Sequence, residues 1–207
     1  MKKGLLLMTL LVLSAISIFA IVSGSEAPET LLDSGFLRSY LFSEYVVYEL
    51  RSPSSAGYTL KILRREFVDD IKSGFFKRPS FSIPEGPNFL MGIFNDILLV
   101  DTGTAPEPRT VSIYDLNTEQ LIHRDLYFSP VEIVDGHLSY FSLLENPFRA
   151  GEERDFPGLL PEELYEKIEG MLEVHPYLGV AVAERLLFNF ETEQIVRTGE
   201  FSLYYVQ

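Results

Sequence analysis

The residues Asp101, Thr102 and Gly103 follow the apolar run Ile97–Val100 and are the strongest candidates for chemistry in this sequence. A carboxylate at a strand end acts as an acid–base catalyst when a second carboxylate faces it, because the two share one proton and their pKa values separate. The same residue types also end strands and start loops without any catalytic role. The sequence favours this structural role for Asp101 over the catalytic one.

The six residues Val100–Ala105 resemble the active-site motif of aspartic peptidases. The resemblance implies that Asp101 is one of two catalytic carboxylates, that the Thr102 hydroxyl bonds the partner loop and that Gly103 allows close backbone approach. The sequence then departs from that family, because the charged, proline-rich loop Pro106–Arg109 stands where the peptidases continue with an apolar strand. The family also needs a second Asp, which a second subunit would supply. A single-lobe, dimeric aspartic peptidase using Asp101 is therefore the alternative function.

Other kinds of reactive site have weaker support. The motif Asp33-Ser34-Gly35 follows only Leu31-Leu32, without a strand of useful length. The chain has no cysteine, which excludes disulfides, thiolate ligands and a catalytic thiol. The three histidines, His123, His137 and His175, lack the spacing of zinc ligands, and no phosphate-binding or dinucleotide-binding glycine pattern occurs. The sequence therefore predicts neither a metal site nor a cofactor.

The N-terminus has the pattern of a secretory signal. Two lysines precede an apolar run over residues 4–22, and a small polar stretch follows. The run is also long enough to span a bilayer if it is not cut. Candidate cleavage points follow Ala20 and Gly24, which place a small residue before the cut.

We therefore predict two parts, a signal peptide or N-terminal membrane anchor at residues 1–24 and a single β-rich globular domain at 25–207. The domain is expected to be periplasmic or extracellular, with membrane contact only through residues 4–22 if they are not cleaved. Its length is sufficient for a core without disulfides.

The domain is strongly acidic. The whole chain has 17 basic and 30 acidic residues, and removal of residues 1–24 takes away Lys2 and Lys3 but no acid. The remaining 15 basic residues against 30 acidic ones give a net charge of about −15. Such a charge argues against binding to nucleic acid or to an anionic membrane surface. It suits a protein partner or envelope component with a basic surface.

Short apolar segments alternate with turn-forming pairs over most of the chain. Asp135-Gly136 is the strongest signal for a two-residue hairpin, and Asn95-Asp96 tolerates the same backbone conformation. The spacing favours a mainly β fold, an antiparallel meander that forms a sandwich, a barrel or a curved sheet. Segment 77–88 contains three prolines and is expected to be irregular, and 65–72 is a candidate short helix. The expected strands are 39–50, 58–62, 89–94, 97–100, 111–116, 120–123, 131–134, 137–144, 181–190, 194–197 and 201–206.

Two segments of the sequence resemble each other. Tyr114–Ile122 and Phe188–Val196 both alternate apolar and polar residues, share an identical Thr-Glu-Gln and end on two apolar residues. The simpler interpretation is one hairpin turn used twice, and the alternative is a duplicated β unit.

One acidic helix is expected near 159–173. Pro161 suits a first helical position, and Leu164 and Ile168 recur at helical spacing. Its outer face carries an acidic series that includes Glu162, Glu166 and Glu169. A solvated face is the usual role of such a charge run, and a docking surface for a basic partner is the other.

The absence of a reactive constellation favours a non-enzymatic binding or interaction module for a protein or envelope component. Its candidate contact surfaces are the loop that contains Thr104, Glu107 and Arg109, which two prolines stiffen, and the acidic helix face with Glu162, Glu166 and Glu169.

Overall fold

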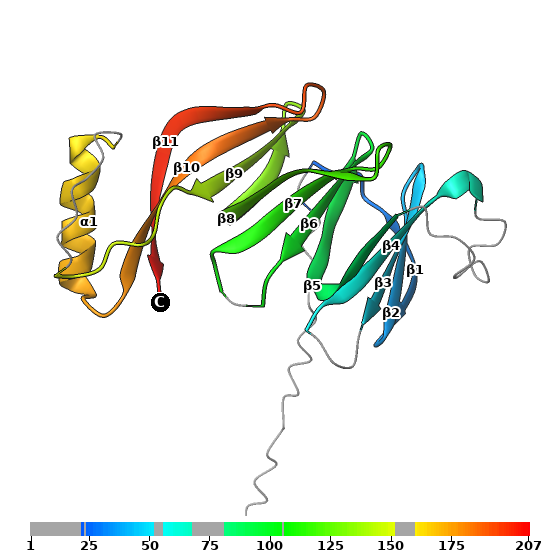
Figure 1. Ribbon diagram of the computed structural model, residues 1–207, viewed down its shortest axis with the longest axis horizontal. Coiled ribbons are helices and arrows are strands. Elements are labelled where there is room, and N and C mark those ends of the chain that lie inside the picture. The colour runs from blue at the N-terminus through cyan, green and yellow to red at the C-terminus, as the bar shows by residue number, and fades with distance from the viewer. Residues whose placement is uncertain (1–21, 23, 52–55, 68–80, 105, 152–159) are drawn as a thin grey trace, which may run out of the picture.

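The computed structural model describes residues 22, 24–51, 56–67, 81–104, 106–151 and 160–207. Within this part of the chain, the eleven strands form one antiparallel sheet in which spatial order equals chain order (Figure 1). The strands are β1 (Glu29–Ser34), β2 (Leu37–Leu41), β3 (Tyr45–Arg51), β4 (Tyr58–Arg64), β5 (Phe81–Phe94), β6 (Ile97–Thr102), β7 (Arg109–Asp115), β8 (Gln120–Val134), β9 (His137–Leu143), β10 (Gly179–Asn189) and β11 (Ile195–Val206). The predicted mainly β meander is therefore confirmed, and it has the form of a curved sheet that does not close, with β1 and β11 at its edges.

Strand β6 is buried on both faces of the sheet, which explains its continuous apolar sequence. Ile97 and Leu99 contact a core that extends to β10, whereas Leu98 and Val100 on the opposite face belong to a core shared with β3 and β4. The two halves of the sheet therefore curve around cores on opposite faces, and β6 lies where they meet. The position that follows on the Ile97 and Leu99 face is Asp101.

Three expected strand boundaries were wrong, because a turn divides one expected strand and two pairs of expected strands each form one strand with an irregular position. The segment 39–50 is two strands, β2 and β3, joined at Ser43-Glu44. Residues 45–49 are all buried, so that both faces of β3 are covered. Conversely, 120–123 and 131–134 belong to the single strand β8, and 194–197 and 201–206 belong to β11.

Strand β5 begins at Phe81, inside the segment 77–88 that was expected to be irregular. Its pairing with β4 shifts register between Tyr58 and Leu60, so that residues 84–87 bulge out of the ladder. Proline is tolerated at such bulges because no ladder hydrogen bond is required of it there. The Asn88 side chain spans the bulge and donates to the carbonyls of Tyr58 and Pro84. Residues 77–80 lie outside the described part of the chain.

The two segments with Thr-Glu-Gln form the same turn at two hairpins, β7–β8 and β10–β11. Glu119 and Glu193 both have positive φ, at 59° and 55°. In each turn the side-chain oxygen of the residue four positions earlier, Asp115 or Asn189, accepts backbone or hydroxyl hydrogen bonds from the turn. The prediction of one turn used twice is confirmed.

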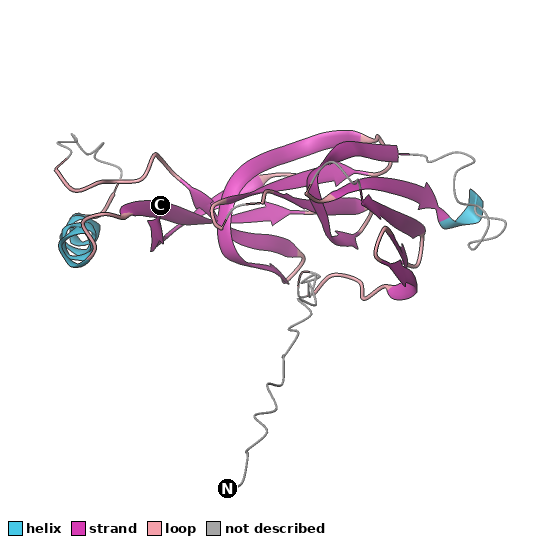
Figure 2. Cartoon of the chain, turned by 90° about the horizontal axis from the view of Figure 1, so that it is seen from below, coloured by secondary structure: helices cyan, strands magenta, loops and turns pink. Residues whose placement is uncertain are grey.

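Helix α1 (Glu162–Val174) lies between β9 and β10 in the chain and covers one end of the sheet (Figure 2). Ile168 packs against Val180 and Val182 of β10. The helix was expected near 159–173; it begins at Glu162, and residue 159 is outside the described part. A short 3-10 helix, η1 (Arg65–Phe67), follows β4 where the short helix 65–72 was expected, and residues 68–72 are not described.

The folded unit reaches back to Val22, within the predicted signal segment. Val22 is buried in the same core as Met91, and its N–H donates to the Met91 carbonyl at 2.9 Å. The N–H of Glu26 donates to Ile93 at 3.4 Å. These residues lie along the half of β5 that β4 leaves unpaired.

If a signal peptidase cuts this chain, we expect the cut to follow Ala20 rather than Gly24. A cut after Gly24 would remove Val22 from the core, and loss of one buried valine costs roughly 1.5 kcal/mol. The mass of the exported protein identifies its first residue, and denaturant unfolding compares chains that start at Ile21 and at Ser25. A mature protein that starts at Ser25 with full stability would contradict this assignment.

Candidate functional site

One face of the sheet carries a row of polar side chains across several strands. Arg109 on β7 stands opposite Tyr127 on β8. Tyr127 stands opposite Ser142 on β9, which in turn stands opposite Glu184 on β10. Directly opposed residues of antiparallel strands share a face, so these side chains lie on the same side of the sheet. We call this row, together with Asp101, Asp125, Tyr140 and Arg197 on the same face, the polar band.

At one end of the polar band, Arg109 and Tyr127 hold the carboxylate of Asp101. Asp101 is only 9% exposed, the Nε of Arg109 donates to its Oδ1 at 2.9 Å, and a terminal guanidinium nitrogen contacts its other oxygen. The Tyr127 hydroxyl also bonds to the carboxylate. Burial raises the pKa of Asp101 above its ordinary value, and the bonds from Arg109 and Tyr127 oppose this rise. This geometry is that of an internal ion pair.

The aspartate of the other Asp-x-Gly motif lies elsewhere. Asp33 is near the end of β1 and accepts a bond from the Nε of Arg38 at 3.1 Å. Four strands, β2 to β5, separate β1 from β6 in the sheet. Asp33 and Asp101 are therefore not partners within one chain.

The centre of the polar band is a hydrogen-bonded group on β8 and β9. The Nε2 of His123 lies 3.0 Å from the hydroxyl of Tyr140, and that hydroxyl lies 3.5 Å from Asp125. Burial raises the pKa of Asp125, but hydrogen bonds from His123, Ser142 and the Leu126 amide outweigh this effect and leave the pKa below its ordinary value. Ser142 thus bonds to the carboxylate and not to the histidine.

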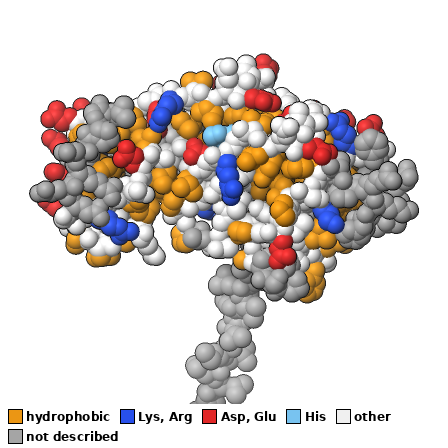
Figure 3. Space-filling view, viewed as in Figure 1, with side chains coloured by type: hydrophobic (Ala, Val, Ile, Leu, Met, Phe, Trp, Pro, Cys, Tyr) orange, Lys and Arg blue, Asp and Glu red, His pale blue; other side chains and the backbone are white. Residues whose placement is uncertain are grey.

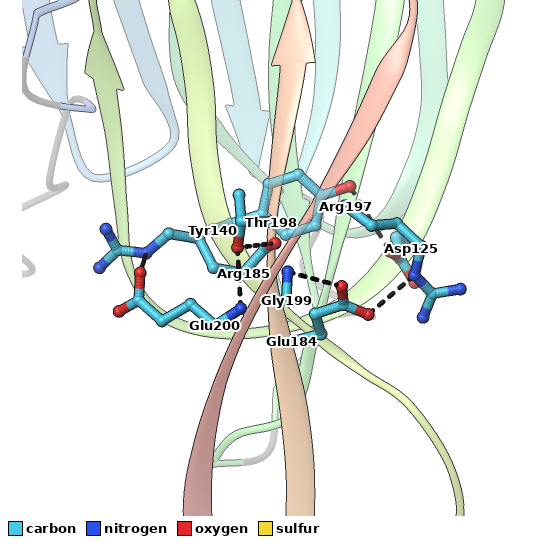
Figure 4. A network of polar contacts seen from close by, with 8 residues as sticks. All are labelled: Asp125, Tyr140, Glu184, Arg185, Arg197, Thr198, Gly199 and Glu200. Carbon is cyan, nitrogen blue, oxygen red and sulfur yellow. Dashed lines mark hydrogen bonds and ion pairs between the residues drawn. The ribbon is translucent and has the colours of Figure 1, made fainter. Parts of the chain in front are cut away.

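At the other end of the band, Glu184 forms a second buried pair, with Arg197. Glu184 is 5% exposed, and its Oε2 accepts from the Nε of Arg197 at 2.7 Å. Its Oε1 accepts from the N–H of Gly199 at 3.1 Å. Figure 4 shows this pair on one side of the two strands and the Arg185–Glu200 pair on the other.

A bulge in β11 makes this pair possible. Glu184 is opposite Phe201 and Leu186 is opposite Arg197, so three residues of β11, 198–200, stand against the single residue Arg185 of β10. Gly199 has φ +73°, which favours glycine. The extra residues turn the Gly199 N–H toward the carboxylate, and bulges of this kind commonly redirect side chains near binding sites.

The Glu184–Arg197 pair borders a cavity of about 440 Å³, which we call the Glu184 pocket. The pocket lies where β10 and β11 meet the chain that follows β9 and the start of α1. Its size is within the range of small-ligand sites. Its apolar walls are Leu144, Phe148, Leu160, Val182 and Phe201, and its polar groups belong to Glu145, Glu184 and Arg197. Figure 3 shows that apolar side chains also gather over the middle of the face viewed there, with scattered charges among them.

The candidates of the β6–β7 loop are largely engaged with their own chain. Glu107 accepts from the N–H of Ser129 at 2.8 Å, and Arg109 donates both to Asp101 and to the carbonyl of Gly103. Thr104 is exposed. Thr102 donates to the side chain of Asn88 on β5 at 3.2 Å.

The acidic candidates of α1 lie on its solvent-exposed side. Glu162, Glu166 and Glu169 are exposed, while Leu164 and Ile168 between them are buried. Leu160, two residues before the helix, lines the pocket. This residue before the helix therefore reaches the Glu184 pocket, the helix candidates themselves do not line it, and the β6–β7 loop lies at the other end of the polar band.

The described residues lack two features, a cluster of metal ligands and a membrane-spanning helix. They contain no group of three or more histidine, aspartate or glutamate side chains placed to hold a metal ion. None of the helices in the described ranges has the length and apolar character needed to cross a bilayer. Residues 4–21 of the proposed signal or anchor lie outside those ranges.

Sequence reasoning missed Glu184 and Arg197. A signal for Glu184 was present, because it is the one acid at the alternate strand positions that Val180, Val182 and Leu186 also occupy. Arg197 had no such signal, since its position depends on the bulge. Comparison with protein-family models, with curated proteins and with solved structures found no match to this chain.

Proposed function

We propose that this chain is an exported, non-enzymatic binding domain that holds an envelope component at the Glu184 pocket. The observation that carries the proposal is the combination of a preformed apolar cavity with a buried, hydrogen-bonded ion pair at its border. Apolar walls with a few fixed polar groups are typical of ligand sites. The polar groups that line the cavity are two acids and one guanidinium, a set suited to orienting a ligand.

The acidic face of α1 supports a partner with a basic surface. Its glutamates are exposed, and the excess of acid over the whole chain would attract a cationic surface at long range. The helix face with Glu162, Glu166 and Glu169 is therefore a second contact surface in this proposal, separate from the pocket.

A plug in the pocket tests the proposal. The chain has no tryptophan, so Leu144→Trp both fills the cavity and provides a fluorescent reporter, while Val134→Trp at an exposed position away from the pocket is the matched control. The neutral apolar dye Nile red is expected to bind the native chain and the control at one site, and to bind Leu144→Trp at least tenfold more weakly. Circular dichroism verifies that each variant is folded.

A second readout concerns the natural ligand. Organic extracts of the exported native protein are expected to contain a molecule, visible by mass spectrometry, that extracts of Leu144→Trp lack. Reversal of Glu162, Glu166 and Glu169 to lysine is expected to leave Nile red binding unchanged but to weaken salt-sensitive retention of that component. Equal dye binding and equal extracts in the native and plugged proteins would refute the pocket as the binding site.

The alternative function, a dimeric aspartic peptidase, has less geometric support. It needs Asp101 to face a carboxylate of a second copy, whereas Arg109 and Tyr127 occupy both oxygens in one chain. A dimer with cleavage of unfolded protein at pH 3–6 that Asp101→Asn abolishes would favour the peptidase over the binding domain.

A further inference from the structure

One nitrogen of the Arg197 guanidinium is held by a hydrogen bond, and its two terminal nitrogens are available to a ligand. Its Nε is engaged by Glu184 at 2.7 Å. Among the described residues, no hydrogen bond or ion pair is recorded for its two terminal nitrogens, and the side chain is 64% exposed. The guanidinium is therefore held at the border of the Glu184 pocket with its donor fork open.

The carboxylate of Glu184 is, in contrast, already satisfied. Both of its oxygens accept hydrogen bonds, one from Arg197 and one from the Gly199 N–H. A cationic ligand would have to compete with Arg197 for this buried acid. An anionic ligand instead meets a guanidinium whose orientation is set in advance, which lowers the entropic cost of binding.

Most of the side chains that share the cavity with this guanidinium are apolar, and the other charged groups in the lining are Glu145 and the paired Glu184. Leu144, Val182 and Phe201 lie with Arg197 around the same cavity of about 440 Å³. The matching ligand has an apolar chain for the cavity and a planar anionic head for the fork, because a guanidinium binds a carboxylate through two parallel hydrogen bonds.

We propose that the Glu184 pocket binds an amphiphile of the fatty-acid class, with its hydrocarbon chain against Leu144, Val182 and Phe201 and its carboxylate on the terminal nitrogens of Arg197. This inference rests on the proposed binding function and specifies its ligand. The role of Glu184 is to position Arg197, and the role of the Gly199 bulge is to satisfy the second oxygen of Glu184.

Calorimetric titration of the intact domain with three amphiphiles of equal chain length tests the head group. Decanoate, decanol and decyltrimethylammonium are used below their micelle concentrations. We expect decanoate to bind at least tenfold more tightly than decanol, and the cation to bind most weakly. Equal binding of decanoate and decanol, or tighter binding of the cation, would overturn the assignment of the carboxylate to Arg197 while leaving a pocket ligand intact.

Variants of the arginine test the same contact. Arg197→Met is expected to weaken decanoate at least tenfold and to leave decanol unchanged, and Arg185→Met, on the opposite face of the sheet, is the matched control. If Arg197→Met does not fold, Arg197→Lys takes its place. The lysine keeps the positive charge next to Glu184 but lacks the two parallel donors of a guanidinium, so we expect the affinity for decanoate to fall severalfold. Unchanged decanoate affinity in the folded variant would refute the proposal.

Absence of binding by all three amphiphiles would also refute the fatty-acid ligand. The plug experiment with Nile red and Leu144→Trp then decides the proposed function separately. Saturable dye binding that the plug removes, together with no binding of decanoate, would leave a binding domain with a ligand of another class.

Discussion

Replacement of Arg109 by methionine is expected to lower the free energy of unfolding by about 3 kcal/mol, the usual cost of leaving one partner of a buried ion pair without its counter-charge. Asp101 is 9% exposed and takes bonds from the Arg109 guanidinium, so the variant leaves a buried carboxylate with only Tyr127 as its donor. Urea unfolding at pH 7 measures the difference.

The double variant Asp101→Leu with Arg109→Met separates the ion pair from simple loss of packing. Replacing both charges by apolar groups of similar size is often neutral or stabilising. We therefore expect the double variant to regain most of the stability lost by Arg109→Met alone. A loss below about 1 kcal/mol in the single variant, which is the value of an exposed pair, would mean that Asp101 is not held as described.

Replacement of Glu49 by glutamine is expected to raise the free energy of unfolding at pH 7 by about 1 kcal/mol, because each unit by which burial raises a carboxyl pKa is worth about 1.4 kcal/mol against the charged form. Glu49 has no exposed surface. Its carboxylate accepts from the N–H of Leu90 at 3.1 Å and from the Tyr40 hydroxyl at 3.2 Å. Burial raises the pKa of Glu49 despite these bonds, and a glutamine retains an acceptor for Leu90 without a buried charge.

The pH dependence gives the sign of this effect. Because the folded-state pKa of Glu49 is raised, the native protein binds more protons than the unfolded chain between the ordinary glutamate pKa and the raised one. This contribution to stability is fully present below the ordinary value and is lost as the pH rises through the raised value. The Glu49→Gln variant should lack this loss of stability with rising pH, whereas the control Glu191→Gln, in an exposed turn, should show the same loss as the native protein. A Glu49→Gln variant less stable than the native protein at pH 7 would contradict this account.

The antiparallel order of the strands could be predicted from the sequence because the hairpin turns contain residues typical of such turns. Asp135-Gly136, Asn95-Asp96 and the two Thr-Glu-Gln segments each fall at a hairpin, with positive φ at residues such as Asp135 and Asn95. Strand ends were less predictable where a strand bends. Residues 84–87 and 198–200 leave the ladder, and such bulges depend on the neighbouring strand rather than on local sequence.

The candidate site was predicted only in part, for a related reason. Glu49, Asp101 and Glu184 are acids at alternate strand positions that buried apolar residues otherwise occupy. All three are buried and accept hydrogen bonds from other strands. The sequence identified Asp101 through its motif but offered no motif for Glu49 or Glu184. Their partners, such as Leu90 and Arg197, come from distant or irregular segments, so that the register of the whole sheet is needed to find them.

The bulge at Gly199 also affects how the protein behaves at high concentration. Strand β11 is an edge of the open sheet, and a long regular edge offers its unpaired backbone groups to the edge of another molecule. The three residues 198–200 interrupt that regular spacing near the middle of the strand and place Arg197 and Glu200 beside the interruption. The arrangement that orients Arg197 therefore also opposes edge-to-edge aggregation, and we expect a sequence change that straightened β11 to lower solubility as well as the proposed ligand affinity.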